Sequence, residues 1–329
     1  MLYPGLYEQV INNALNRELA EIPEARKSTA PIDTAEAAKV LAQYLADVVQ
    51  KGLENVQDNG GGIEAQIQLA NQIINTIQTT TEEADFAALG VDQRAEQLLA
   101  LLQQNDPRLA TGKSAKDLDR PETSIAQSSL FTGAIHEPQM YTELKKEIVS
   151  ADRIDMLVSF IKWSGLRLIM DELQQFAQSG GELRIITTSY MGATDVKAIE
   201  ELRALSNTKI KVSYDTKRTR LHAKTYVFYR DTGFTTAYVG SSNLSNAAIS
   251  SGLEWNVKVT RKDLPETIEK IAATFESYWN SSEFEYYDEG QRERLTRALK
   301  AEKYSETDHS GIYTLDIPVS YTHLRAHET

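Results

Sequence analysis

A strand–turn–strand pattern in residues 221–240 constrains the fold of this chain more than any other feature. Residues 221–229 carry the Leu, Tyr, Val and Phe side chains typical of a β-strand, and residues 234–239 predict the returning strand. Asp231-Thr232-Gly233 between them predicts a turn. Residues 253–259 alternate apolar and polar side chains, which predicts a further strand after the hairpin.

Strand-like and helix-like segments alternate from residue 128 onward, which predicts an α/β fold with a mixed sheet covered by helices. In open sheets the ligand site lies at strand ends, so we expect Lys224 and residues 240–243 to gather there. The expected strands are 129–132, 154–161, 183–188, 209–214, the 221–240 hairpin and 253–260, and the expected helices lie near 138–150, 165–178, 194–205 and 265–278.

The rest of the chain divides by composition. Residues 1–104 show helical periodicity and predict a small all-α bundle of four helices, the last containing Leu98 and Leu101. The remaining expected segments are a linker at 105–124, the α/β domain at 125–285 and the start of a helical or linker segment at 286–318. Residues 319–329 resemble a translated sequencing adapter. We therefore expect them to be an artefactual tail that is not part of the fold.

Composition excludes several classes of protein. The chain has 329 residues, 41% of them hydrophobic, and a formal net charge of −12. No apolar run approaches the ~20 residues that a membrane helix needs, and no signal peptide opens the sequence, so we expect a cytoplasmic protein without a membrane partner. The absence of cysteine excludes disulfides, thiolate metal sites and cysteine catalysis, and no His and carboxylate spacing suggests zinc.

The residues that carry chemistry follow strands or their ends. Side chains alternate along a strand, so His222 and Lys224 point the same way. Gly240-Ser241-Ser242-Asn243 ends the hairpin, and we expect it to open a helix whose free N–H groups receive a phosphate near Asn243. Glu254 shares a face of the next strand with Asn256, where it either orients the imidazole of His222 or pairs with a neighbouring cation. Trp255, on the other face, is expected in the core.

This set resembles the motif of the phospholipase D superfamily, His-x-Lys followed by Gly-Ser-x-Asn, matched here by His222, Lys224, Gly240, Ser241 and Asn243. The superfamily's aspartate, five positions after the lysine, is Tyr229 in this chain. The resemblance implies a phospholipase D-like fold and a metal-independent phosphodiesterase without a cofactor.

In the mechanism that the resemblance implies, His222 is the nucleophile and forms a phosphohistidine, with its tautomer fixed by Glu254. Lys224, Asn243 and Ser241 hold the non-bridging oxygens. The leaving oxygen needs a proton from a second imidazole, but only one of the five histidines belongs to a His-x-Lys. The resemblance therefore implies a homodimer with the site on its two-fold axis.

A local excess of positive charge indicates DNA as the partner. Between residues 208 and 224 six Lys and Arg side chains stand against Asp215 alone, in an otherwise acidic chain. Such a ridge would contact a phosphate backbone, although Lys217 and Arg218 by themselves are equally well read as a solvated loop. The expected DNA-binding residues are Lys211, Lys217, Arg218 and Arg220.

The layout of residues 1 to about 300 also resembles the amino-terminal part of bacterial nuclease–helicase proteins, which implies a downstream DEAD/DEAH-type helicase domain and a role in restriction or defence. ATP and Mg would then belong to that domain alone. Two alternatives stay open: a catalytically silent DNA-binding or dimerisation module, and a phospholipid-acting phospholipase D enzyme. The second is disfavoured because no membrane-binding amphipathic segment is evident.

Overall fold

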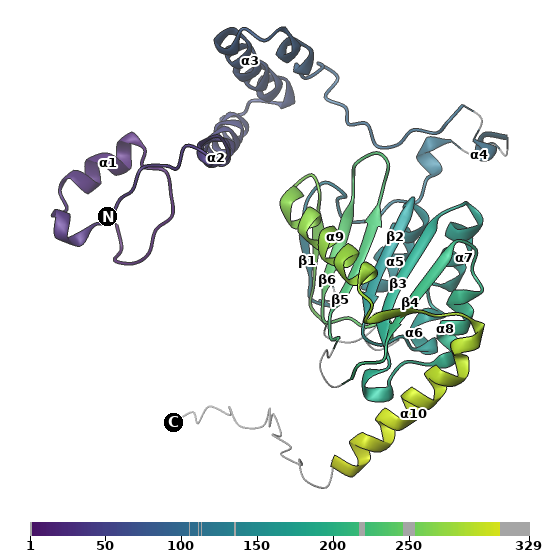
Figure 1. Ribbon diagram of the computed structural model, residues 1–329. Coiled ribbons are helices and arrows are strands. Elements are labelled where there is room, and N and C mark those ends of the chain that lie inside the picture. Colours follow the sequence, from purple (N-terminus) through teal and green to yellow (C-terminus); the bar gives the residue numbers. More distant parts are fainter. Residues whose placement is uncertain are drawn as a thin grey trace, which may run out of the picture. The chain divides into compact units, whose positions relative to one another are not determined.

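The computed structural model describes residues 2–104, 106–110, 112, 114–134, 136–216, 221–245 and 254–309. The chain divides into two compact units, Met1–Leu101 and Leu102–Thr329. Figure 1 traces the helices and strands of both.

A single mixed sheet organises the second unit. Within the described residues it has eight strands in the order β1-β7-β6-β5-β2-β3-β4-β8. β2, β3 and β4 run parallel, and every other neighbouring pair is antiparallel. The strands are β1 (Ser129–Phe131), β2 (Arg153–Val158), β3 (Glu182–Thr188), β4 (Thr208–Ser213), β5 (Lys224–Tyr229), β6 (Thr236–Gly240), β7 (Asn256–Thr260) and β8 (Phe284–Tyr286).

Helices cover both faces of this sheet (Figure 1). One large core joins α5, α7, α8 and α10 to strands β2 to β6. On the opposite face, α9 packs through Phe275 and Trp279 in one cluster and Ile268 in another. The helices are α4 (Pro107–Ala110), α5 (Met140–Val149), α6 (Trp163–Leu166), α7 (Met170–Gln178), α8 (Val196–Arg203), α9 (Pro265–Asn280) and α10 (Arg292–His309).

The predicted mixed α/β architecture is confirmed, and the observed strands and helices overlap each predicted segment from residue 128 to 280. The predicted turn is also present, with Gly233 at φ 82°, a conformation that glycine adopts without steric cost. β8 was not predicted, because a three-residue strand carries too little alternation to be recognised.

α10 lies within the predicted helical or linker segment 286–318 and packs onto the α/β unit. Leu295 and Leu299 are buried at 0% and 5% exposure in the large core. The Leu299 carbonyl lies so close to Gly192 that a Cβ there would collide with it. Gly192 is in the 3₁₀ turn η4 (Tyr190–Gly192), directly after β3. α10 therefore supports the loop that follows one of the central strands.

A buried ionic network ties α5 to the antiparallel half of the sheet. Glu147 of α5 is fully buried and pairs with Arg230 at 2.6 Å and with Lys258 of β7 at 2.9 Å. Tyr238 of β6 donates its hydroxyl to the same carboxylate at 2.9 Å. Burial alone would raise the pKa of Glu147, but Arg230 and Lys258 outweigh it and hold the pKa below its ordinary value. Loss of one charged partner would leave a buried charge without its counter-ion. The network therefore fixes how β5, β6 and β7 lie against α5.

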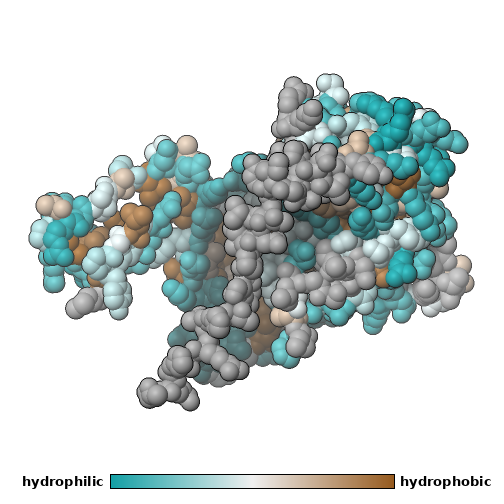
Figure 2. Space-filling model, turned by 90° about the horizontal axis from the view of Figure 1, so that it is seen from below, coloured by the Kyte–Doolittle hydropathy of each residue, from teal (hydrophilic) through white to brown (hydrophobic). Residues whose placement is uncertain are grey.

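The first unit contains the predicted helices α1 (Asn13–Ala20), α2 (Ala37–Asp58) and α3 (Ile63–Thr81). Asn12 caps α1 by accepting the N–H groups of Ala14 and Leu15. The packing is thin, because Ile67 is the one buried apolar side chain among the described residues of this unit. Apolar side chains accordingly reach the surface among these helices (Figure 2).

The predicted fourth helix, around Leu98 and Leu101, is wrong. Residues 96–103 have no helical turns, and Leu98 and Leu101 are each 77% exposed. The four leucines of this run would share one broad face of a helix, and a helix with such a face is stable only where that face is buried. The first unit offers no core that could bury it.

We predict that Leu295→Ala lowers the free energy of unfolding of the α/β unit by about 2–5 kcal/mol, because it opens a cavity in the large core. Arg297→Ala, an exposed position on the same helix, serves as control and should change it by less than about 0.5 kcal/mol. Urea unfolding monitored by tryptophan fluorescence gives both values. Equal effects of the two variants would show that α10 is not part of the folded unit.

Candidate functional site

Four strand ends meet at one edge of the sheet and place the motif residues together. Val158, the last residue of β2, lies opposite Lys224, the first residue of β5. Thr225 lies opposite Val239 of β6, and Gly240 lies opposite Asn256, the first residue of β7. This register brings residues 222–224, 240–243 and 254–256 to a common edge, as the sequence predicts.

The His-x-Lys pair is in direct contact. Lys224 Nζ lies 3.0 Å from Nδ1 and 3.1 Å from Nε2 of His222, and it donates to the His222 carbonyl at 2.8 Å. His222 is exposed, whereas Lys224 is only 5% exposed. The ring edge-packs against Phe160, with centroids 6.5 Å apart. An accessible imidazole thus lies beside a cation held by the sheet.

The position of Lys224 depends on β5, where it shares a face with Tyr226 and Phe228 in the large core. Burial lowers the pKa of Lys224 below its ordinary 10.5, and the charge of Glu254 partly opposes this shift. Glu254 therefore acts electrostatically on Lys224.

The Gly240–Asn243 segment curves back toward the end of β2. A Cβ on Gly240 would collide with the Trp255 carbonyl, so the close approach of the two chain segments requires glycine. Asn243 accepts the Phe160 N–H through Oδ1 at 3.1 Å. With the oxygen engaged in this way, the amide Nδ2 is the group that can donate to a ligand.

Ser241 and Ser242 have different surroundings. Ser241 is exposed, and its Oγ accepts the Trp255 N–H at 3.2 Å. Ser242 is fully buried, and its Oγ accepts from Asn256 Nδ2 at 2.7 Å while its carbonyl accepts the Tyr226 hydroxyl at 3.0 Å. The expected helix after Asn243 would fall largely in residues 246–253, outside the described residues.

Tyr226, Asn256 and Phe160 support the site although the motif does not include them. The period-two pattern signals two of them, since Tyr226 shares the face of Lys224, and Asn256 shares the face of Glu254. No pattern in the sequence signals Phe160, because its contribution is a backbone N–H brought to Asn243 from 83 residues away.

The prediction that Trp255 lies in the core is wrong, since its side chain is 63% exposed. The alternation itself is confirmed: Asn256 and Lys258 are buried, whereas Val257 is 44% exposed. Among the described residues, no helix covers the outward face of this end of β7, so the residues that alternate outward reach solvent.

Tyr229, which replaces the superfamily's aspartate, lies far from the motif. It is the last residue of β5 and pairs with Arg153 at the start of β2, five residues along the strand from Lys224. At ~3.3 Å per residue the separation is roughly 17 Å. Burial, and secondarily the charge of Asp155, raise the pKa of Tyr229 to about 12, and the Arg153 guanidinium covers its ring at 3.8 Å. The replacement therefore changes a structural contact at the opposite end of the strand.

The predicted DNA-binding role of Lys211 is wrong. Lys211 is 7% exposed, donates to the Trp279 carbonyl at 2.5 Å and lies over the Tyr286 ring at 4.4 Å, so its charge is used within the fold. Lys217, Arg218 and Arg220 lie outside the described residues.

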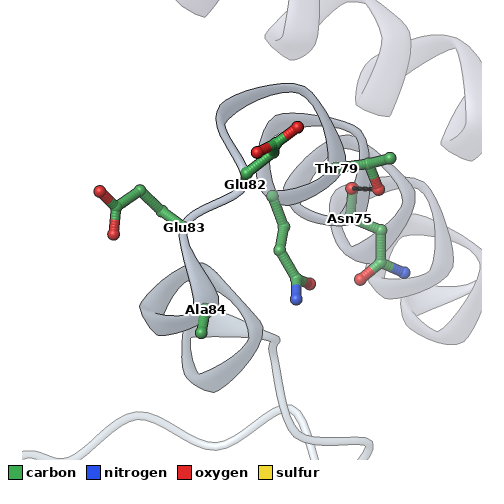
Figure 3. A pocket seen from close by; sticks show the side chains of 6 residues that line it. Asn75, Thr79, Glu82, Glu83 and Ala84 are labelled. Atoms are coloured by element: carbon green, nitrogen blue, oxygen red, sulfur yellow. Dashed lines mark hydrogen bonds between the residues drawn. The ribbon is translucent and has the colours of Figure 1, made fainter.

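One hollow of the molecule has a composition unsuited to phosphate. A cavity of about 340 Å³ between α3 and the 3₁₀ segment η2 (Ala84–Leu89) is lined by Asn75, Gln78, Thr79, Glu82, Glu83 and Ala84 (Figure 3). Thr79 Oγ1 donates to the Asn75 carbonyl at 2.8 Å. The two glutamates would repel an anion.

Among the described helices, none is both long and apolar enough to cross a bilayer.

Comparisons with known proteins support the motif. The model of the family described as "Cardiolipin synthase, PLD-like domain" matches residues 144–279. None of the curated proteins matches the chain.

Three solved structures are similar to part of this chain. NucT from Helicobacter pylori is 20% identical over 46% of this chain and 94% of its own, with a TM-score of 0.36. The phospholipase D family member Nuc from Salmonella typhimurium is 20% identical over 49% of this chain and 99% of its own, with a TM-score of 0.38. Phosphatidylserine synthase from Haemophilus influenzae Rd KW20 is 11% identical over 56% of this chain and 46% of its own, with a TM-score of 0.37.

At these TM-scores the structural similarities do not bear on the family of the domain. The family match and the motif are what identify it. The matched segment runs from α5 to α9 and contains His222, Lys224 and Asn243. The chain therefore carries a phospholipase D-like domain.

Proposed function

We propose that this domain is a metal-independent phosphodiesterase that cleaves DNA through a phosphohistidine intermediate formed in a homodimer. The observation that carries the proposal is the contact between Lys224 Nζ and the exposed His222 ring, at 3.0 and 3.1 Å from its two nitrogens. This contact supports the proposal because a nucleophile and an anion-binding cation would then lie within reach of the same phosphate.

In the first step a ring nitrogen of His222 attacks phosphorus. The P–N bond forms as the P–O bond to the leaving group breaks, and the leaving oxygen takes a proton from a second imidazole. In the second step that imidazole removes a proton from water, whose oxygen attacks phosphorus and releases His222. Lys224 and the Asn243 Nδ2 hold the non-bridging oxygens, which supplies the charge stabilisation that phosphoryl transfer needs. Exposed Ser241 is proposed as a further donor to these oxygens.

Glu254 is proposed to keep Lys224 charged. The carboxylate raises a pKa that burial lowers, and only the ammonium form neutralises a phosphate. Its orienting action on His222 would then pass through Lys224, which contacts the ring.

A second copy of the chain is proposed to supply the second imidazole. An uncovered apolar strip next to the site supports this arrangement. Leu130, Val257 and Val239 lie side by side on β1, β7 and β6 and are 45%, 44% and 39% exposed. With Trp255, they give a surface on which a like copy could bury apolar area.

DNA is the proposed substrate because the sequence between β4 and β5 is rich in Lys and Arg. Linkage to a helicase in a restriction or defence protein is a further part of the proposal, based on the sequence layout alone.

We predict that His222→Ala lowers the rate of cleavage of labelled DNA by roughly 10³-fold or more, because both chemical steps use this ring. The matched control is His136→Gln, which alters an exposed histidine outside the motif and should leave the rate unchanged. Cleavage by the parent chain should persist in EDTA. Full activity of His222→Ala, or loss of cleavage under chelation, would refute the mechanism.

We predict that kcat/KM falls as the pH rises, with a midpoint below pH 10.5, the ordinary pKa of lysine. Burial lowers the pKa of Lys224, so its ammonium form is lost at a lower pH. Glu254→Gln removes the charge that opposes this shift, so the fall should move to still lower pH. Glu182→Gln, at the start of β3, is the control and should leave the midpoint pH of this fall unchanged. A fall at or above pH 10.5, or a shift upward in Glu254→Gln, would contradict this role of Lys224.

We predict that exchanging subunits with an equal amount of His222→Ala reduces activity to roughly one quarter of that of the parent chains at the same total concentration, since only dimers with two intact copies would cleave. Native mass spectrometry with two mass tags verifies the exchange. A residual activity of roughly one half, the value for independent protomers, would show that each copy holds a complete site.

A further inference from the structure

A basic pocket with an apolar floor begins three residues from the candidate site. It has a volume of about 450 Å³ and lies between the starts of α6 and α8 and one face of α10. Trp163, Val196 and Leu299 provide apolar surface, and Lys197, Lys300 and Lys303 line the same pocket. Pockets of this size accommodate a group of small-molecule dimensions.

The charge of this pocket suits a phosphate backbone. Asp195 is the one carboxylate among its lining residues, and it is already engaged by the Trp163 N–H at 2.9 Å and by Lys162 Nζ at 3.6 Å. Lys197 and Lys300 are exposed. Lys197 Nζ lies over the Trp163 ring, 4.1 Å from its centre, so an arriving base would displace this exposed side chain from the indole face.

The pocket is connected to the motif by backbone hydrogen bonds. Phe160, whose N–H binds Asn243, precedes Trp163 by three residues, so the two residues are at most roughly 11 Å apart. Lys162 N–H donates to the Leu244 carbonyl at 2.8 Å, and Asp195 N–H donates to the Ile161 carbonyl at 2.8 Å. The Phe160 ring lies 6.5 Å from the His222 ring between centroids, so a strand whose phosphate lies at His222 would reach this pocket within a few nucleotides.

We infer that this pocket binds the substrate as single-stranded DNA, with one unpaired base over Trp163 and the flanking phosphates on Lys197 and Lys300. The inference rests on the proposed function and specifies its substrate. An indole stacks on a base only where the base is free of a partner, and the lysines neutralise phosphates irrespective of sequence. Bases in a duplex are already stacked, so a duplex would use the lysines alone.

The test measures binding and not cleavage, in the full chain carrying His222→Ala. The probe is a fluorescein-labelled oligothymidylate of about 12 nucleotides, within the usual span of single-strand sites. Trp163→Ala should weaken binding by roughly 5- to 150-fold, the range of base stacking on aromatic side chains. Trp163→Phe, which keeps an aromatic face, should retain most of the affinity.

Lys300→Gln tests the phosphate contact without touching the core. It should make the dependence of log affinity on log salt shallower by about 0.7, the value for one phosphate contact on a single strand. Lys270→Gln removes the same charge from α9 on the opposite face of the sheet and should leave affinity and salt dependence unchanged.

Unchanged affinity in Trp163→Ala together with an unchanged salt dependence in Lys300→Gln would overturn the inference. A duplex of the same length that binds as tightly as the single strand would also overturn it. Failure of the proposed catalytic function is a separate result. It would be the inability of the parent chain to hydrolyse a small phosphodiester such as bis(p-nitrophenyl) phosphate, which has no flanking nucleotide to occupy this pocket.

Discussion

The site depends on the antiparallel insertion of β5 between β2 and β6. β2 belongs to the parallel half of the sheet and ends where β5 begins, so Val158 and Lys224 are neighbours. Had β5 run parallel to β2, its motif end would lie at the opposite edge, roughly 17 Å from Asn243. One change of strand direction therefore decides whether His222 and Asn243 lie at the same end of the strands, as the proposed mechanism needs.

The surroundings of the motif are organised to keep one cation both buried and charged. Lys224 is removed from water by β5 and the large core, which favours its neutral form, while Glu254 and the His222 carbonyl favour the ammonium. The network around Glu147 holds β5, β6 and β7 against α5 from the other end of the same strands. Rigid strand ends suit the phosphoryl transfer that we propose, because catalysis of that reaction is mostly positioning and charge stabilisation.

Local sequence pattern predicted the elements and the motif, and long-range packing explains what it missed. The alternation of side chains predicted the strands next to Lys224 and Glu254. The spacing of the motif predicted that His222 and Asn243 lie at one edge of the sheet, which the strand register agrees with. Lys211 looked like a surface cation, but its strand pairs with β8, a strand too short to predict, and Trp279 of α9 closes over it. Trp255 looked apolar enough for the core, yet no helix in the described part of the chain covers that end of the sheet. Neither outcome is encoded within a window of a few residues.

The central claim is that His222 forms a bond to phosphorus, and the most direct measurement is to identify that bond. A rapid quench of the parent chain with ³²P-labelled DNA at alkaline pH, followed by peptide mapping, would locate the attached phosphoryl group. The account predicts an acid-labile, alkali-stable adduct on the peptide containing His222, absent from a parallel sample of His136 peptides. Cleavage of the DNA without any adduct on His222 would contradict it.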